Sequence, residues 1–164
     1  MAETPAHAAA IERVLDRAFG PGRFAKPSER VREFAPPLPA LSRVAMAKGV
    51  VLGVCRISEI AIGDHAAYFL GPLAVDPDAQ HGGLGHLLVS AAVEACRADG
   101  RGAAIVLMGE PSFFGALGFV RIPWGRVAMP VPVEARRLQW LGFDETALAA
   151  VTGAVSPPRA ASPA

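Results

Sequence analysis

Three glycines at the start of a helical pattern are the residues of this sequence best suited to hold a ligand. Gly82, Gly83 and Gly85 follow the strand-like run that leads into AVDPDAQH, and an amphipathic stretch begins with Leu84. The first turn of a helix has free backbone N–H groups and a partial positive charge, and glycine leaves the main chain open to an anion. The pattern predicts a phosphate or pyrophosphate site, or else a tight turn with only a packing role.

Two common phosphate-binding motifs do not fit this loop. A Walker-type loop needs a Lys directly after its last glycine, whereas here Gly85 precedes His86. A dinucleotide-binding loop that started at Gly83 would need a small third residue where Leu88 stands. Hydrolysis of a nucleoside triphosphate and dinucleotide binding are therefore both disfavoured.

The histidines and cysteines show no metal-binding pattern. His81 and His86 lie in the loop and on the following helix without a carboxylate or cysteine at ligand spacing, so we expect them near phosphates and predict no metal. Cys55 lies in a strand-like run and Cys96 on the apolar side of the helix. Because CxxC spacing is absent, both are predicted to be buried free thiols.

Composition limits the class of protein. The 164 residues are 52% apolar, with 16 basic and 15 acidic residues and a net charge of +1. One compact domain is expected over 1–153, followed by a flexible tail at 154–164 that is rich in Ala, Ser and Pro. Neither a basic patch for nucleic acid, nor a membrane-spanning run of roughly 18 apolar residues, nor a signal peptide is evident. A cytoplasmic protein with small-molecule or protein partners is expected.

Hydrophobic periodicity and turn residues predict alternating helices and strands. In chain order they are a helix at 11–19, a helix at 29–34, strands at 41–47, 50–60 and 68–75, a helix at 84–99, a strand at 103–109, a short helix at 111–118 and a strand at 126–133. The apolar stripe of the helix at 84–99 is predicted to comprise Leu84, Leu87, Leu88, Ala91, Ala92 and Ala95.

One strand carries an unusual interruption. Gly71-Pro72 lies within the strand at 68–75, and a proline removes a ladder donor, so this strand is predicted to bulge and to be unpaired on one edge. The helix at 84–99 then connects it to the strand at 103–109. A parallel pair with a right-handed crossover is expected.

The glycine loop and two other motifs resemble a known family. Gln80, Gly83 and Gly85 match its QxxGxG loop, LAVDPDAQ matches the strand and turn before that loop, and Phe114–Phe119 match its aromatic-x-x-x-Gly-Phe signature at the expected distance. Over residues 11–133 the chain resembles the GCN5-related N-acetyltransferases, the GNAT family. The segments AFGPGR, GPLAVDP and MGEPSFFGALGF look most like its YhbS-like bacterial branch.

The resemblance implies an α/β fold with a mixed, mostly antiparallel central sheet, helices on both faces and a splayed pair of strands that binds acetyl-CoA. It implies that the loop amides bind the pyrophosphate and that the splayed strand holds the pantetheine. The implied binding residues are Leu73, Ala74, Val75, Gln80, His81, Gly82, Gly83, Leu84, Gly85, His86 and Phe114.

The activity that the resemblance implies is transfer of an acetyl group to a primary amine by direct attack in a ternary complex. The implied acceptor is a small molecule or a peptide. A homodimer is one assembly that the resemblance leaves possible. The alternative is a non-catalytic acyl-CoA-binding sensor or interaction protein with the same fold.

The sequence departs from the family pattern where acid–base chemistry would take place. Many members carry a tyrosine where Phe114 stands, which protonates the leaving thiolate, and many carry a carboxylate where Phe69 stands. Tyr68 is predicted to point to the other face and to pack there, because side chains alternate along a strand. Gly82 replaces a residue that is often basic, and the family's first strand is shortened or missing before the first helix.

Glu110, His65 and Glu59 remain as candidates for acid–base catalysis. Glu110 ranks first because it ends the strand that would diverge from the cofactor strand. Its carboxylate could therefore act on the acceptor through a water. Its alternative role is to cap the helix that follows. Glu59 and His65 flank an exposed turn, where a surface role is more common. Trp124 and Trp140 either wall the acceptor pocket or fill core.

Overall fold

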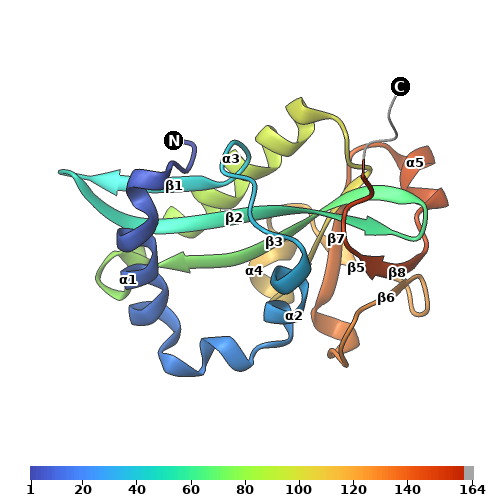
Figure 1. Cartoon of the computed structure of the whole chain (residues 1–164), viewed down its shortest axis with the longest axis horizontal. Coiled ribbons are helices and arrows are strands. Elements are labelled where there is room, and N and C mark those ends of the chain that lie inside the picture. Colours follow the sequence, from blue (N-terminus) through green and yellow to red (C-terminus); the bar gives the residue numbers. More distant parts are fainter. Residues whose placement is uncertain (161–164) are drawn as a thin grey trace.

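The computed structural model describes residues 1–160, whose strands form one mixed sheet (Figure 1). The eight strands of this part of the chain are β1 (Arg43–Ala47), β2 (Val50–Ile62), β3 (His65–Val75), β4 (Ala104–Met108), β5 (Val120–Arg121), β6 (Val127–Ala128), β7 (Leu138–Gly142) and β8 (Gly153–Ser156). Their order is β5-β7-β4-β3-β2-β8-β6, and β1 also pairs with β2. The β3–β4 and β6–β8 pairs are parallel and the other ladders antiparallel, so the predicted mixed, mostly antiparallel sheet is confirmed.

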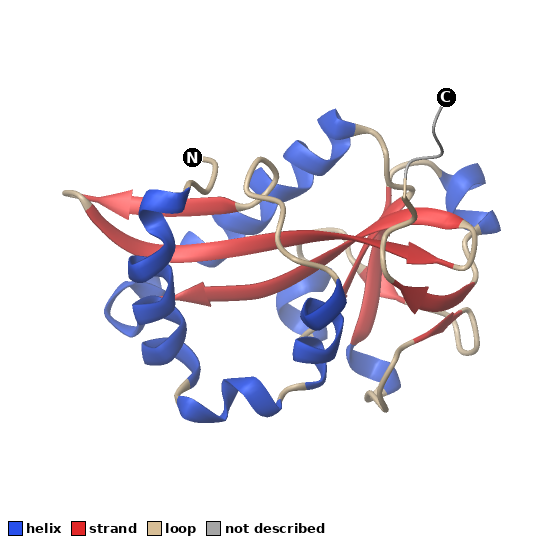
Figure 2. Ribbon diagram, in the orientation of Figure 1, coloured by secondary structure: helices blue, strands red, loops and turns tan. Residues whose placement is uncertain are grey.

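Helices cover both faces of the sheet (Figure 2). They are α1 (Ala8–Phe19), α2 (Pro27–Phe34), α3 (Leu84–Asp99), α4 (Pro111–Gly115) and α5 (Glu145–Ala150), with short 3₁₀ turns at η1 (Pro5–His7), η2 (Pro21–Ala25), η3 (Pro77–Gly82) and η4 (Ala135–Arg137). Because side chains alternate along a strand, neighbouring residues of β2 serve opposite faces. Val54 packs with α1 and Cys55 packs with α3. Within residues 1–160 no helix has both the length and the apolarity to cross a membrane.

The predicted bulge lies in β3. The pairing of β3 with β2 shifts by one residue between Leu70 and Leu73, in the segment that contains Gly71-Pro72. On its other edge β3 pairs with β4 only through Tyr68 and Phe69, and the ladder between them ends there. The two parallel strands therefore separate toward their carboxyl ends, which is the splayed arrangement that the sequence led us to expect.

Tyr68 ties the other end of this strand pair to α3. The side chain is buried, its hydroxyl donates to the carboxylate of Asp99, and it accepts a hydrogen bond from the Gly102 N–H at 3.1 Å. Burial and the hydrogen bond to Asp99 raise the pKa of Tyr68 to about 12. Tyr68 is a packed strand aromatic, as predicted.

The buried face of α3 differs from the predicted stripe. Leu87 and Ala91 are exposed, with 65% of Leu87 accessible. The residues that α3 buries are Leu88, Val89, Ala92, Val93 and Cys96. Both sets are apolar and share the helical period, so the period alone does not say which set faces the sheet.

The C-terminal third differs most from the prediction. Of the strand expected at 126–133 only β6 forms, because Pro130 and Pro132 have no N–H to donate to a ladder. The sequence prediction lacks β5, β7, α5 and β8 altogether. The short helix expected at 111–118 is α4, which ends at Gly115.

The C-terminal end of the chain needs correction, and the N-terminal end adds one bridge to the sheet. β8 pairs with the end of β2 and buries Val155, so the predicted flexible tail does not begin at residue 154; residues 161–164 lie outside the described part. At the other end, a single bridge between Ala2 and Arg43 extends the sheet past β1. Residues 1–7 therefore contribute this one bridge and no strand to the sheet.

The contact between β8 and the β2–β3 turn generates a stability prediction. Gly63 in that turn has φ +55°, and a Cβ there would collide with the carbonyl oxygen of Thr152. Gly49, in the β1–β2 turn, has φ +77° with open space around it. Gly49→Ala should cost about 1 kcal/mol of unfolding free energy, from the backbone conformation alone, and Gly63→Ala roughly 2 kcal/mol more. Urea unfolding of both variants checks this, and equal losses would contradict the packing of β8.

Candidate functional site

The separation of β3 from β4 opens onto a cavity of about 960 Å³. The cavity is bounded by α1, η2 and α2, by the bulge of β3, by the end of β4 with α4, and by the segment 132–137. Phe69, Leu73, Glu110 and Phe114 all line it. A molecule held in the cavity would lie beside the unpaired edge of β3.

The glycine loop begins α3 without a side-chain cap. Gly83 is the N-cap residue with φ +70° and ψ 11°, a left-handed conformation that glycine adopts without strain. A Cβ at Gly82 or Gly83 would meet nothing within 4 Å, so the main chain is open there. Gln80 donates through Nε2 to the Val75 carbonyl at 3.3 Å, which joins the loop to the end of β3. The first N–H groups of α3 are thus available to an anion.

A buried carboxylate anchors this loop. Asp76, which is 7% exposed, accepts a hydrogen bond from the Asp78 N–H at 3.0 Å and caps η3. Arg17 of α1 binds Asp76 at 2.8 Å and Asp78 at 2.9 Å, and these contacts raise the pKa of Arg17. Sequence analysis missed this anchor, although the Asp-Pro-Asp order is a signal for a capped turn.

Aromatic rings link the start of α3 to α4. His86 stacks on Phe113 with ring centroids 4.3 Å apart and an interplanar angle of 6°. Phe114 packs edge-on against Phe113 and Phe119, at 4.8 and 5.8 Å, and is 8% exposed. The position that would carry a tyrosine therefore lies at the cavity, and Phe113 is a lining residue that sequence analysis missed.

Glu110 lies at the cavity but does not cap α4 with its side chain. Its carbonyl oxygen accepts from the N–H groups of Phe113 and Phe114 at 3.1 Å, and the side chain makes no capping bond. The carboxylate is half exposed and lies 3.4 Å from Arg136 and 3.8 Å from Arg137. Of the three candidate catalytic residues, Glu110 is the one that lines the cavity.

The structure does not bring Glu59 or His65 to the cavity. Glu59 pairs with Arg101 at 2.9 Å, and His65 begins β3 at the end remote from the bulge. Side-chain alternation and distance along the strands separate both from the site. Trp140 is core, at 4% exposure, and Trp124 is 89% exposed, so neither tryptophan walls the cavity.

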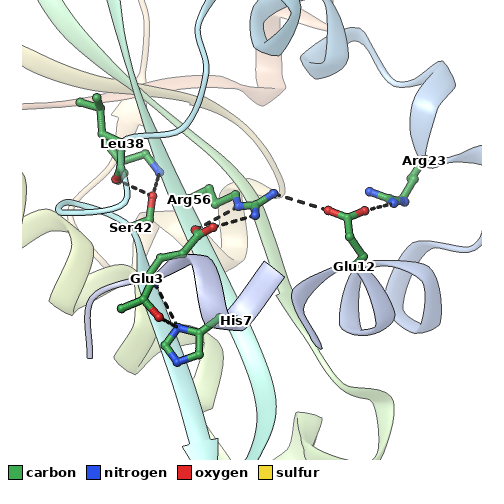
Figure 3. A network of polar contacts seen from close by, with 9 residues as sticks. Glu3, His7, Glu12, Arg23, Leu38, Ser42 and Arg56 are labelled. Carbon is green, nitrogen blue, oxygen red and sulfur yellow. Dashed lines mark hydrogen bonds and ion pairs between the residues drawn. The ribbon is translucent and has the colours of Figure 1, made fainter. Parts of the chain in front are cut away.

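A series of ion pairs fixes the α1 side of the cavity (Figure 3). Arg56 binds both carboxylate oxygens of Glu3, at 2.7 and 3.0 Å, and lies 3.8 Å from Glu12. Glu12 accepts from Arg23 at 2.5 Å, and Arg23 also binds Asp16 at 3.0 Å. The charges of Arg23 and Arg56 are thus neutralised within the protein. Sequence spacing could not reveal this network, because Glu3 and Arg56 are 53 residues apart.

The two cysteines are core residues and not nucleophiles. Cys55 and Cys96 are free and buried, as predicted. Burial raises the pKa of both thiols, that of Cys96 to about 12, so both stay protonated at neutral pH. Among residues 1–160 no three His, Cys, Asp or Glu side chains come together as metal ligands.

Similarity to known proteins agrees with this geometry. Residues 8–121 match the model of the Acetyltransferase (GNAT) family. The structure is similar to the GNAT-family N-acetyltransferase YhbS from Escherichia coli in complex with CoA, with 27% identity, a TM-score of 0.79 and coverage of 94% of this chain and 86% of that one. It is also similar to a GNAT-family acetyltransferase from Brucella melitensis in complex with acetyl-CoA, with 26% identity, a TM-score of 0.68 and coverage of 95% and 92%.

More distant similarity extends to the fold alone. The ribosomal-protein-S18-alanine N-acetyltransferase from Escherichia coli is 19% identical, with a TM-score of 0.56 over 85% of this chain and 87% of that one. No curated relative matches the sequence. The family model spans the chain from α1 to β5 and includes the bulged strand, the glycine loop and α4. The chain therefore belongs to the GNAT family of acetyltransferases.

Proposed function

We propose that this protein transfers the acetyl group of acetyl-CoA to a primary amine by direct attack in a ternary complex. The observation that carries the proposal is the meeting of three features: an uncapped, glycine-rich start of α3, an unpaired bulged strand, and a cavity that reaches the bulge and Phe113, the ring on which His86 of α3 stacks. The E. coli and Brucella relatives, solved with CoA and acetyl-CoA, support the choice of donor.

The main chain of two segments would hold the donor, and its open geometry fits this role. The N–H groups over 81–86 bind the pyrophosphate, since no side chain shields Gly82 or Gly83. The unpaired edge of β3 at Leu73–Val75 offers peptide groups to the pantetheine amides and to the thioester carbonyl. When bound, acetyl-CoA supplies the acetyl thioester.

The residues of the chain hold the two substrates in position and supply one carboxylate. In the reaction the amine nitrogen bonds to the acetyl carbon, the carbon–sulfur bond breaks, and the amine loses a proton. Glu110 accepts that proton through a water, because it is the half-exposed carboxylate at the open end of β4. Phe114 has no proton for the thiolate, so solvent supplies one.

Positioning can account for much of the rate without a tyrosine. Well-oriented reactants reach effective molarities of about 10⁵ to 10⁸ M, whereas one positioned acid or base adds about 10² to 10⁴.

The second candidate function is a non-catalytic acyl-CoA-binding sensor. It is favoured by the apolar side chains of Phe69 and Phe114, which stand at the two positions where many family members carry a titratable side chain.

Ligand-dependent stability and turnover test the proposal directly. Acetyl-CoA should raise the melting temperature, whereas ATP and NAD should not, because a ligand that binds only the native state adds about 2.7 kcal/mol at a hundredfold excess over its Kd. A panel of primary amines should then release CoA and yield acetylated product. Stabilisation by acetyl-CoA without product from any amine would favour the sensor, and stabilisation by NAD would contradict the donor.

Gly83→Val should abolish CoA binding in a folded protein. The two added methyl groups would stand where the pyrophosphate approaches the main chain of an exposed loop. Gly100→Val is the matched control, because Gly100 ends the same helix with nearly the same backbone angles, φ 71° and ψ 1°, far from the loop. Both variants should lose similar stability, and calorimetry should show CoA binding in the control only. Unchanged affinity in Gly83→Val would mean that the phosphates bind elsewhere.

Phe114→Tyr tests whether protonation of the leaving thiolate limits turnover. The added hydroxyl should reach the leaving group from a ring that already lines the cavity, and CoA release should rise about tenfold or more with little change in acetyl-CoA affinity. Phe113→Tyr is the control, since it adds a hydroxyl to the neighbouring ring, which stacks on His86. Initial rates against pH compare the forms. No gain over an active parent would show that release needs no acid from this position.

A further inference from the structure

The cations of the cavity fall into two groups that differ in pairing. Arg23 and Arg56 belong to the neutralised network on α1 described above (Figure 3). Lys26, Arg32 and Arg137 form the second group, which we name the cationic corner. They line the same cavity where η2 and α2 face the segment 132–137.

Nearby carboxylates do not fully neutralise the cationic corner. Glu29 pairs with Arg32 within α2. Glu134 pairs at 3.0 Å with Arg136, which stands outside the cavity lining. Glu110 lies 3.4 Å from Arg136 and 3.8 Å from Arg137, so its charge is shared between these two. Two carboxylates, those of Glu29 and Glu110, thus face three cations.

Of the three cations in the cationic corner, Lys26 is the one that makes no ion pair within residues 1–160. Within residues 1–160 no carboxylate oxygen lies within 4.0 Å of its ammonium, which instead lies 3.8 Å from the centroid of the Phe19 ring. Partial burial lowers the pKa of Lys26, and the charges of Arg32 and Arg137 lower it further. An anion that enters the cavity would relieve this repulsion and would gain charge-assisted hydrogen bonds.

The cationic corner and the β3 bulge line the same cavity. The cavity of about 960 Å³ is lined by Lys26 and Arg137 as well as by Leu73 at the bulge, and the guanidinium of Arg32 lies beside Gly71, 3.5 Å from where a Cβ would stand. A volume of this size suits a small molecule. An acceptor whose amine lies at the bulge therefore places its far end within reach of the cationic corner.

We propose that the acceptor carries a carboxylate besides its amine, and that Lys26, Arg32 and Arg137 bind this carboxylate while the amine faces the β3 bulge. The inference rests on the proposed function and names its substrate class. Arginine binds a carboxylate through parallel N–H groups, whereas lysine acts as a compact charge, so the three together hold one anionic end. A free amino acid and the C-terminal carboxylate of a short peptide share this chemistry.

Matched acceptors test the inference. The acceptors are ω-amino acids of increasing chain length, each paired with its own primary amide. The two members of a pair differ in the carboxylate alone. The carboxylate form should have a kcat/KM at least about tenfold above that of its amide, mainly through KM. Lys26→Met should remove most of this ratio, because it keeps an apolar stem and loses the charge. Lys48→Met, which changes the other lysine of the sequence in the remote β1–β2 turn, should keep it.

The outcomes separate this inference from the proposed function. Equal use of acid and amide by the parent, or a ratio unchanged in Lys26→Met, would overturn the carboxylate site while leaving acetyl transfer intact. Short peptides with free or amidated carboxyl termini distinguish a peptide source from a free amino acid. If no amine is acetylated, calorimetry with the N-acetylated ω-amino acids and their amides in the presence of CoA decides: tighter binding of the acid supports the site, and equal or absent binding overturns it.

Discussion

The separation of β3 from β4 is the constraint on which the rest of the site depends. The two strands pair through Tyr68 and Phe69 and then part, because Gly71-Pro72 adds a residue to β3 and the proline has no N–H to give to a ladder. Unpaired peptide groups next to a cavity need a partner. The splay therefore creates both the space and the hydrogen-bonding edge that a thioester donor would use.

Helix α1 connects the two halves of the site. Arg17 on one part of its surface binds Asp76 and Asp78, which anchor the glycine loop. Glu12 and Asp16 on another part bind Arg23, which fixes η2 at the cavity wall. A shift of α1 would disturb the glycine loop and the cavity wall together, so this one helix couples their positions.

Charged side chains line much of the cavity, whereas two positions where many family members carry titratable groups are apolar. Phe69 and Phe114 are apolar where many family members carry a titratable side chain, and the charged side chains of the cavity lie on its other walls. Charges that are partly removed from water interact more strongly than charges in bulk solvent. Carboxylates neutralise Arg23 and Arg56 on one wall of the cavity. Lys26, on another wall, contacts the Phe19 ring and has no carboxylate partner among residues 1–160.

Local pattern in the sequence determined the glycine loop, the bulge, the first hairpin and the helices α1 to α4, because turn chemistry and short periods act over a few residues. Comparable patterns failed for β7 and β8, whose short runs of five and four residues gain their strand identity only by pairing with β4 and β2. The tertiary structure alone decided the cationic corner, the Arg17 anchor and the placement of Glu59 and His65 away from the cavity. Such contacts join residues as far apart as Arg17 and Asp76, and sequence spacing carries no information about packing at that separation.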